Sequence, residues 1–400
     1  MLICKNNINN IITIILPKLT LLTRFISYIH KKISPYHPKK RILLISRNTI
    51  AADHMLPIAN LLRNMADISL TSTVDRFPNQ EFHNKDATNL LGTKSIHILI
   101  AIIQHWDLII FTNHPYGFGL CFSPKIKKLY INHGLHMGKI NTIEFQDGVY
   151  GKNKILRPLG SPYYSTMFAA SNNEYQFAVD QTPELMGRIE VAGYLKADIL
   201  LENYDKLRTD YRFKINCERK ELVLHIISTW GPNSLLSTYW PQIQNELESL
   251  KHKYKIIISI HPRFNQLTPK KKHTREEILR ECQKHEIYIN DGLDWEGYVA
   301  ASDITLTDHS SLCLYHVLLN HPILLIPVEA DQYLPESTFS HLNKAVLSIA
   351  DYPTILQGLD VAEKQINFIN YEFLAAKILS KRGMASKVYL EKITRILDVN

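Results

Sequence analysis

The chain has 400 residues, of which 45% are hydrophobic and 21% charged, a balance typical of a folded globular protein of two domains rather than a disordered or fibrous one. Its net charge of +8 favours an anionic partner, such as a nucleotide, a polyphosphate or a membrane surface. Five scattered cysteines without a Cys-x-x-Cys pair exclude a disulfide scaffold and a zinc knuckle, so we expect a reduced, cytosolic protein with no metal and no other cofactor.

Residues 1–40 differ in composition from the rest of the chain, because they contain seven basic residues and no Asp or Glu. Apolar side chains recur there at the spacing of one helical face: Leu21, Leu22, Phe25, Ile26 and Ile29. The apolar runs are shorter than the ~20 residues that span a bilayer. The pattern favours a basic amphipathic segment that lies on an anionic membrane surface, with a helix packed on its own domain as the alternative.

From residue 41 onward, strand-like runs alternate with helix-like runs, which predicts parallel sheets covered by crossover helices. The first series occupies residues 41–213, and its strands are predicted at residues 41–46, 68–74, 108–112, 129–132, 167–171 and 189–193. Residues 213–221 are charged and lack apolar periodicity, so we place a domain boundary there.

A second series occupies residues 214–370, with strands predicted at residues 222–228, 256–260, 287–289, 304–306 and 323–327. Residues 371–400 form a predicted helical tail that can cross back to the first domain. Together the two series predict two α/β domains that face one another across a cleft, where ligands sit at the carboxyl ends of the strands.

The polar turn of residues 307–311 joins a predicted strand to a predicted helix and reads Thr-Asp-His-Ser-Ser. The first backbone N–H groups of a helix lack intrahelical partners, and the helix dipole adds partial positive charge there. Ser310 and Ser311 could donate hydrogen bonds to the same anion. The turn therefore predicts a phosphate site, with a simple helix cap made by Thr307, Asp308 and Ser310 as the alternative.

Two other predicted strands end in titratable residues. His133 and Gly134 follow one strand, and a histidine there has a pKa suited to taking a proton from a hydroxyl group. His261, Pro262 and Arg263 follow another strand, where the two basic side chains could neutralise a pyrophosphate. A histidine that satisfies a buried carbonyl, and an arginine in solvent, are the respective structural alternatives.

These motifs, with the segment of residues 193–198 and the run Ser228-Thr229-Trp230, resemble the CDP-glycerol glycerophosphotransferase family in order and spacing. These enzymes are the polyol-phosphate transferases of teichoic acid and capsule synthesis. The resemblance implies a GT-B fold, with two Rossmann-like domains: an acceptor-binding domain at residues 41–213 and a CDP-donor-binding domain at residues 214–370. It also implies peripheral attachment to the cytoplasmic face of the cell membrane.

Carried over by position, the resemblance assigns catalysis to His133 as general base and to His261, which contacts the donor phosphates. It implies the following ligands of the donor phosphates: Arg263, Thr307, Asp308, Ser310 and Ser311. Other substrate contacts are implied for Gly134, Lys139, Thr229 and Trp230. The partners implied are a CDP-activated alcohol, most simply CDP-glycerol, a lipid-linked or polymeric acceptor and an anionic membrane, but no nucleic acid.

The sequence departs from the family pattern at three places. His309 stands where the family has tyrosine, Leu135-His136 where it has Thr-Pro, and residues 195–198 read Leu-Lys-Ala-Asp instead of Pro-Arg-Asn-Asp. These changes leave the polyol open between glycerol, ribitol and a sugar-containing unit. Another GT-B enzyme that acts on a nucleotide sugar, either a glycosyltransferase or an epimerase, is the alternative function, and a non-enzymatic basic protein is a more distant one.

Overall fold

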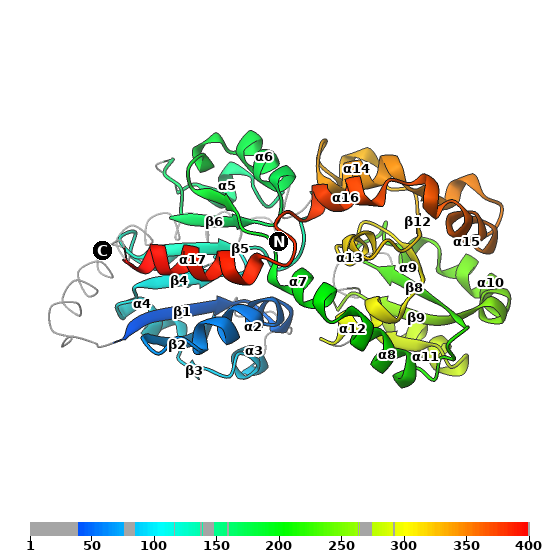
Figure 1. Cartoon of the computed structure of the whole chain (residues 1–400), viewed down its shortest axis with the longest axis horizontal. Coiled ribbons are helices and arrows are strands. Elements are labelled where there is room, and N and C mark those ends of the chain that lie inside the picture. Colours follow the sequence, from blue (N-terminus) through cyan, green and yellow to red (C-terminus); the bar gives the residue numbers. More distant parts are fainter. Residues whose placement is uncertain are drawn as a thin grey trace, which may run out of the picture.

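The computed structural model describes residues 39–75, 85–115, 117–136, 138, 148–157, 160–262, 264, 274–290 and 293–398. The predictions for residues 1–38, Lys139 and Arg263 lie outside these residues. Figure 1 shows two α/β lobes side by side, each built on a parallel sheet, with helix α7 between them. This is the two-domain architecture expected from the alternation of strand-like and helix-like runs.

The first sheet has seven parallel strands in the order β3-β2-β1-β4-β5-β6-β7. Their bounds are β1 Lys40–Ser46, β2 Ile68–Val74, β3 Lys94–Ser95, β4 Leu108–Phe111, β5 Lys127–Ile131, β6 Thr166–Ala169 and β7 Ile189–Val191. The helical segments between them are α2 Thr49–Arg63, α3 Lys85–Leu90, α4 Ile98–Ile103, η1 Gly117–Cys121, α5 Lys152–Ile155, α6 Asn172–Gln181 and η2 Pro183–Leu185.

The second sheet has six parallel strands in the order β10-β9-β8-β11-β12-β13. Their bounds are β8 Leu222–Ser228, β9 Tyr254–Ile260, β10 Tyr288–Asn290, β11 Ile304–Thr307, β12 Ile323–Leu325 and β13 Leu347–Ser348. The helical segments around it are α9 Leu235–Thr238, α10 Trp240–Lys253, α11 Arg275–Lys284, α12 Trp295–Ala301, α13 Cys313–Leu318, η3 Ala330–Gln332, α14 Thr338–Ala345, η4 Ile349–Asp351, α15 Ile355–Lys364, η5 Ile366–Phe368 and α16 Tyr371–Ile378.

The continuous apolar runs of the sequence form strands because both faces of a parallel sheet are covered. In β1, Ile42 and Leu44 pack on the layer that contains α2, whereas Leu43 and Ile45 pack on the opposite layer. Alternate residues of one strand thus supply two different cores. Asn48 then ends the strand and caps α2 by accepting from the backbone N–H of Ala51 at 2.9 Å.

The chain crosses between the domains twice. It leaves the first sheet through α7 (Leu195–Glu202) and α8 (Tyr204–Lys214), and it returns after α16 to form α17 (Ala385–Asp398) against the first sheet (Figure 1). The last carbonyl groups of α17 accept from two lysines of the first domain, Lys40 to Leu397 at 3.1 Å and Lys127 to Ile396 at 2.6 Å. Cations placed there also complement the helix dipole.

Candidate active site

Three neighbouring strands of the second sheet end in predicted site residues. The strands β9, β8 and β11 are adjacent, and they lead into His261, the Ser228–Trp230 run and the turn of residues 307–311. The backbone N–H of His261 donates to the carbonyl oxygen of Ser228 at 3.2 Å, and its ring lies 6.2 Å from that of Trp230. The parallel topology therefore gathers residues from three distant parts of the sequence at one edge.

Asp308 is fully buried and braces this edge. Its carboxylate accepts from the backbone N–H of Thr229 at 2.9 Å and from that of Leu235 at 2.8 Å. Ser228 Oγ lies 3.4 Å away. The carboxylate faces the loop after β8, so Asp308 shapes the loop that carries Thr229 and Trp230. Direct contact of Asp308 with the donor phosphates stays a prediction.

The side chain of Thr307 is also fully buried, and its hydroxyl donates to the carbonyl oxygen of Asp308 at 3.1 Å. Ser310 and Ser311, in contrast, are only partly buried. Within the described part of the chain, neither their hydroxyl groups nor their backbone N–H groups donate a hydrogen bond to protein. The direct donors that the turn offers to an anion are therefore those of Ser310 and Ser311, not the side chain of Thr307.

The helix after this turn is shorter than the sequence indicated. It begins at Cys313, and the N–H groups of Cys313 and Leu314 already donate to the carbonyl oxygens of Ser310 and Ser311, at 3.1 and 3.2 Å. Residues 310 and 311 thus stand one turn ahead of the regular helix. This tight turn holds the two serines in place.

His133 and Gly134 lie opposite this turn, on the first domain. A Cβ atom on Gly134 would stand 3.8 Å from Ser311 Oγ, so the two turns face each other at contact distance. The φ of Gly134 is +149°, a conformation that residues with a side chain rarely adopt. The glycine thus lets the backbone that carries His133 approach the serine turn of the other domain.

The His133 ring is held by the end of β4. Its Nδ1 lies 3.0 Å from the carbonyl oxygen of Thr112 and 3.1 Å from the amide of Asn113. A hydrogen on Nδ1 satisfies the carbonyl oxygen of Thr112 if the Asn113 amide turns its oxygen toward the ring. Nε2 is then the acceptor that a general base needs. The hydrogen bond also fixes the direction of the ring.

The surroundings of His133 keep its ring neutral. Desolvation by the surrounding protein lowers its pKa to about 4, and the positive charge of Arg47 acts in the same direction. Arg47 is anchored beside it, because its guanidinium donates to the carbonyl oxygen of His114 at 2.7 Å. The His133 side chain is exposed, and solvent reduces the size of the pKa shift but not its direction. The ring is therefore neutral and can accept a proton at pH 7.

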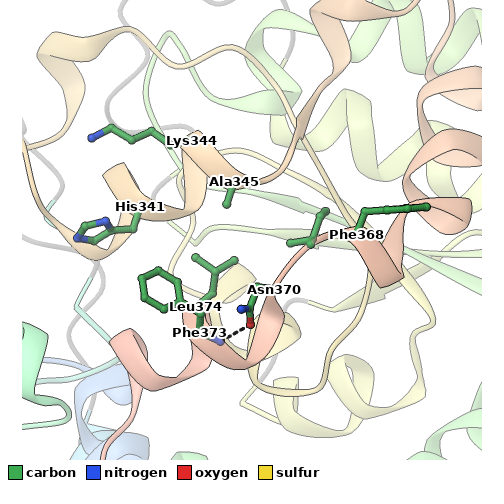
Figure 2. A pocket seen from close by; sticks show the side chains of 8 residues that line it. His341, Lys344, Ala345, Phe368, Asn370, Phe373 and Leu374 are labelled. Carbon is green, nitrogen blue, oxygen red and sulfur yellow. Dashed lines mark hydrogen bonds between the residues drawn. The ribbon is translucent and has the colours of Figure 1, made fainter.

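Two surface hollows lie away from these residues. Figure 2 shows one of about 350 Å³ beside α14 and α16, lined by residues that include His341, Lys344 and Phe373. Another of about 360 Å³ lies beside α7, α8 and α12. None of the predicted site residues lines either hollow. The facing strand ends, with their donors for an anion and a neutral histidine, form the better candidate site.

Sequence reasoning missed Arg47 and Asn113. Asn113 lies in the turn after β4 and contacts His133, and Arg47 donates to the carbonyl oxygen of His114 in the same turn. A signal for both existed, because each follows directly after a buried strand of the first sheet. Among the described residues, no helix is long and apolar enough to cross a membrane. No group of three or more His, Cys, Asp or Glu side chains in the same part of the chain is arranged to hold a metal ion.

Two parallel-sheet domains, with site residues at facing strand ends, define the GT-B class of enzymes. Residues 28–341 match the family described as CDP-Glycerol:Poly(glycerophosphate) glycerophosphotransferase. The chain belongs to this family and is an enzyme of the glycerophosphotransferase type. The resemblance seen in the five sequence motifs is thereby confirmed.

Solved structures show the same fold at low sequence identity. The H444N variant of the wall teichoic acid polymerase TagF has a TM-score of 0.63 and 12% identity, over 98% of this chain and 97% of that one. A UDP-GlcNAc 2-epimerase from Neisseria meningitidis, bound to UDP-GlcNAc, has a TM-score of 0.56 and 15% identity, over 89% of this chain and all of that one. No curated protein matches the chain by sequence.

Proposed function

We propose that the protein transfers glycerol phosphate from CDP-glycerol to a hydroxyl group of a membrane-linked glycan or polyol-phosphate polymer and releases CMP, in teichoic acid or capsule synthesis. Membership of the family supports the donor and the type of acceptor. The observation that carries the proposal is the approach of Gly134 to Ser311, 3.8 Å from a Cβ to the hydroxyl. It sets a neutral histidine against two serines whose donors have no partner among the described residues.

In the proposed reaction, Nε2 of His133 takes the proton of the acceptor hydroxyl while the hydroxyl oxygen attacks the β-phosphorus of CDP-glycerol. A bond forms between that oxygen and the phosphorus, the bond to the bridging oxygen breaks, and the electron pair leaves with CMP. The backbone and hydroxyl donors of Ser310 and Ser311, with His261, offset the charge on the phosphates. Such preorganised donors usually supply the largest catalytic term.

Residues outside the described structure have parts in this proposal. Arg263 would contact the donor phosphates together with His261, and Lys139 would contact the substrate. Thr229 and Trp230 stand on the loop that Asp308 holds, and we assign them to the donor as well. The phosphates of a bound donor would raise the pKa of His133 and strengthen it as a base.

The test is CMP release from CDP-glycerol with a glycerol-phosphate oligomer as acceptor. His133→Ala should lower the rate by roughly 10²–10⁴-fold while donor affinity stays the same, because His133 lies on the first domain. The double variant Ser310→Ala, Ser311→Ala should instead weaken donor binding, since each lost contact with a charged group contributes about 1.5–3 kcal/mol.

Parallel reactions with CDP-ribitol and with UDP-sugars decide the substrate class. Release of UDP without release of CMP would favour the nucleotide-sugar alternative, and wild-type turnover by His133→Ala would remove this residue from the mechanism. Full activity of Lys214→Met, which breaks an exposed ion pair on α8, serves as the control for preparation quality.

Attachment to the membrane is a separate part of the proposal and places the protein at the cytoplasmic face of the cell membrane. Seven basic residues within residues 1–40 contribute about 1 kcal/mol each when close to an anionic surface. The full chain should co-sediment with anionic vesicles and lose this binding as salt rises, whereas a chain that begins at residue 39 should remain folded and unbound. An unstable shortened chain, together with a full chain that ignores vesicles, would favour packing of this segment on the first domain.

A further inference from the structure

The segment of residues 193–198 belongs to the sequence motifs, yet none of its side chains faces the serine turn in the contacts described above. Three alternate positions carry buried polar residues, Tyr194, Lys196 and Asp198, which as whole residues are 4, 6 and 2% exposed. Buried polar groups are retained where they have partners. Each of the three has its partner in a different part of the molecule, so the segment is a junction.

Lys196 is bound by a carboxylate from each domain. Its ammonium donates to Asp53 of α2, in the first domain, at 2.8 Å and to Glu296 of α12, in the second domain. The side chains of Lys196 and Asp53 are each 8% exposed, and that of Glu296 is 14% exposed. Trp295, the neighbour of Glu296, donates from its indole to Asp53 at 3.3 Å. The two domains therefore meet through one shielded cation.

The same network reaches the residue before His133. Asp53 precedes His54, whose Nδ1 lies 2.8 Å from the hydroxyl of Tyr194, and this hydroxyl donates to the carbonyl oxygen of Asn132 at 3.3 Å. Burial lowers the pKa of His54, and the positive charge of Lys196 and the nearby ring of His133 act in the same direction. A continuous chain of contacts thus runs from Glu296 in the second domain to the backbone that carries His133.

Asp198 joins α7, where the chain leaves the first domain, to the segment before α17, where the chain returns to it. Its two carboxylate oxygens accept from the backbone N–H groups of Gly383 and Ala385, each at 2.8 Å, where the chain returns to begin α17. Gly193, at φ +78°, packs against the same return segment: a Cβ there would lie 3.2 Å from Ala385. Both interdomain connections are therefore joined at α7, which lies between the two domains in Figure 1.

We infer that Lys196 is a positioning residue, which sets the approach of His133 to the serine turn by binding Asp53 and Glu296 at once. This inference rests on the proposed function of His133. Without the ammonium, two carboxylates would face each other in a shielded site, and their repulsion would separate α2 from α12. The residues proposed above to bind the donor all lie on the second domain, so the affinity for CDP-glycerol would stay within a few-fold of the wild type.

The test compares Lys196→Met with Lys214→Met, whose exposed ion pair with Asp294 joins α8 to the start of α12 and does not reach the first domain. Lys196→Met should lower kcat roughly 10- to 100-fold, because small displacements of a reacting group have effects of this size. The calorimetric affinity for CDP-glycerol should match that of the wild type. Lys196→Arg should restore most of the activity, because a guanidinium can also bind both carboxylates.

A wild-type kcat in folded Lys196→Met, a loss no larger than that of Lys214→Met, or a parallel loss of donor affinity would overturn the inference. If Lys196→Met does not fold, Glu296→Gln weakens the link of Lys196 to the second domain without leaving two carboxylates unpaired. It should lower kcat by a smaller factor, at unchanged affinity for CDP-glycerol. Small-angle X-ray scattering of the same variants needs no substrate. We expect a broader distribution of distances between the two domains for Lys196→Met than for Lys214→Met. Failure of the wild type to release CMP would contradict the proposed function alone, since scattering still tests whether Lys196 holds the two domains together through Asp53 and Glu296.

Discussion

Removing the carboxylate of Asp308 should destabilise the second domain much more than an ordinary surface substitution. In Asp308→Ala, the backbone N–H groups of Thr229 and Leu235 lose the acceptors that now lie 2.9 and 2.8 Å away. Each buried donor left without a partner costs about 1–3 kcal/mol, so the loss should be about 2–6 kcal/mol. This is a large share of the roughly 5–15 kcal/mol that stabilises a typical protein.

Urea unfolding followed by circular dichroism, without any donor present, measures this loss. Thr229 and Leu235 donate to the same carboxylate oxygen, so Asp308→Asn can keep that oxygen for both. Its N–H₂ then replaces only the second contact of Thr229, at 3.1 Å, so Asp308→Asn should destabilise less than Asp308→Ala. Asp331→Ala, at an exposed aspartate of η3, is the matched control and should change the free energy of unfolding by no more than about 0.5 kcal/mol. The reasoning is refuted if Asp308→Ala unfolds like the wild type but binds CDP-glycerol differently, because the carboxylate would then act on the ligand.

Two further predictions concern pH. Burial lowers the pKa of His225 to about 3 and that of His321 to about 4, and His316 bridges them through contacts of 3.2 and 3.1 Å. Because the unfolded chain takes up these protons first, stability should fall as the pH drops below about 6.5, by about 1.4 kcal/mol per unit for each histidine. Melting temperatures at pH 7 and 5 measure this, and an unchanged slope in His225→Gln would contradict it. Arg47→Gln should raise the pKa of His133 and move the acid limb of kcat/KM upward, since Arg47 contributes to the lowered value; a limb that stays in place would exclude Arg47 as a cause.

The strands could be predicted from sequence because a strand that is buried on both faces is a continuous run of apolar residues. The run at residues 41–46 became β1, Lys40–Ser46, and the run at residues 222–228 became β8 with the same bounds. The helical tail was predicted less well, since it is broken between Ile378 and Ala385. Gly383 was the local signal for that break, with a φ of +71°.

Only those site residues that directly follow a predicted strand could be found from the sequence. The sequence placed His133 and Ser311 after strands, but their approach across two domains depends on packing that no local pattern encodes. For the same reason the contact of Asp308 with Thr229, 79 positions away, could not be predicted from the sequence. Lys196 was visible only as a departure from the family pattern, because its two carboxylates are separated from it by 143 and 100 positions.

The return of α17 has a consequence for how the chain folds as it is synthesised. Part of the core of the first domain comes from the far end of the chain, through the buried side chains of Val388, Tyr389, Ile393 and Leu397. The second domain draws its main core from residues 224–362 and can close while α17 is still inside the ribosome. The domain that is translated first is therefore completed last, and loss of the final helix would expose the hydrophobic surface of the first domain.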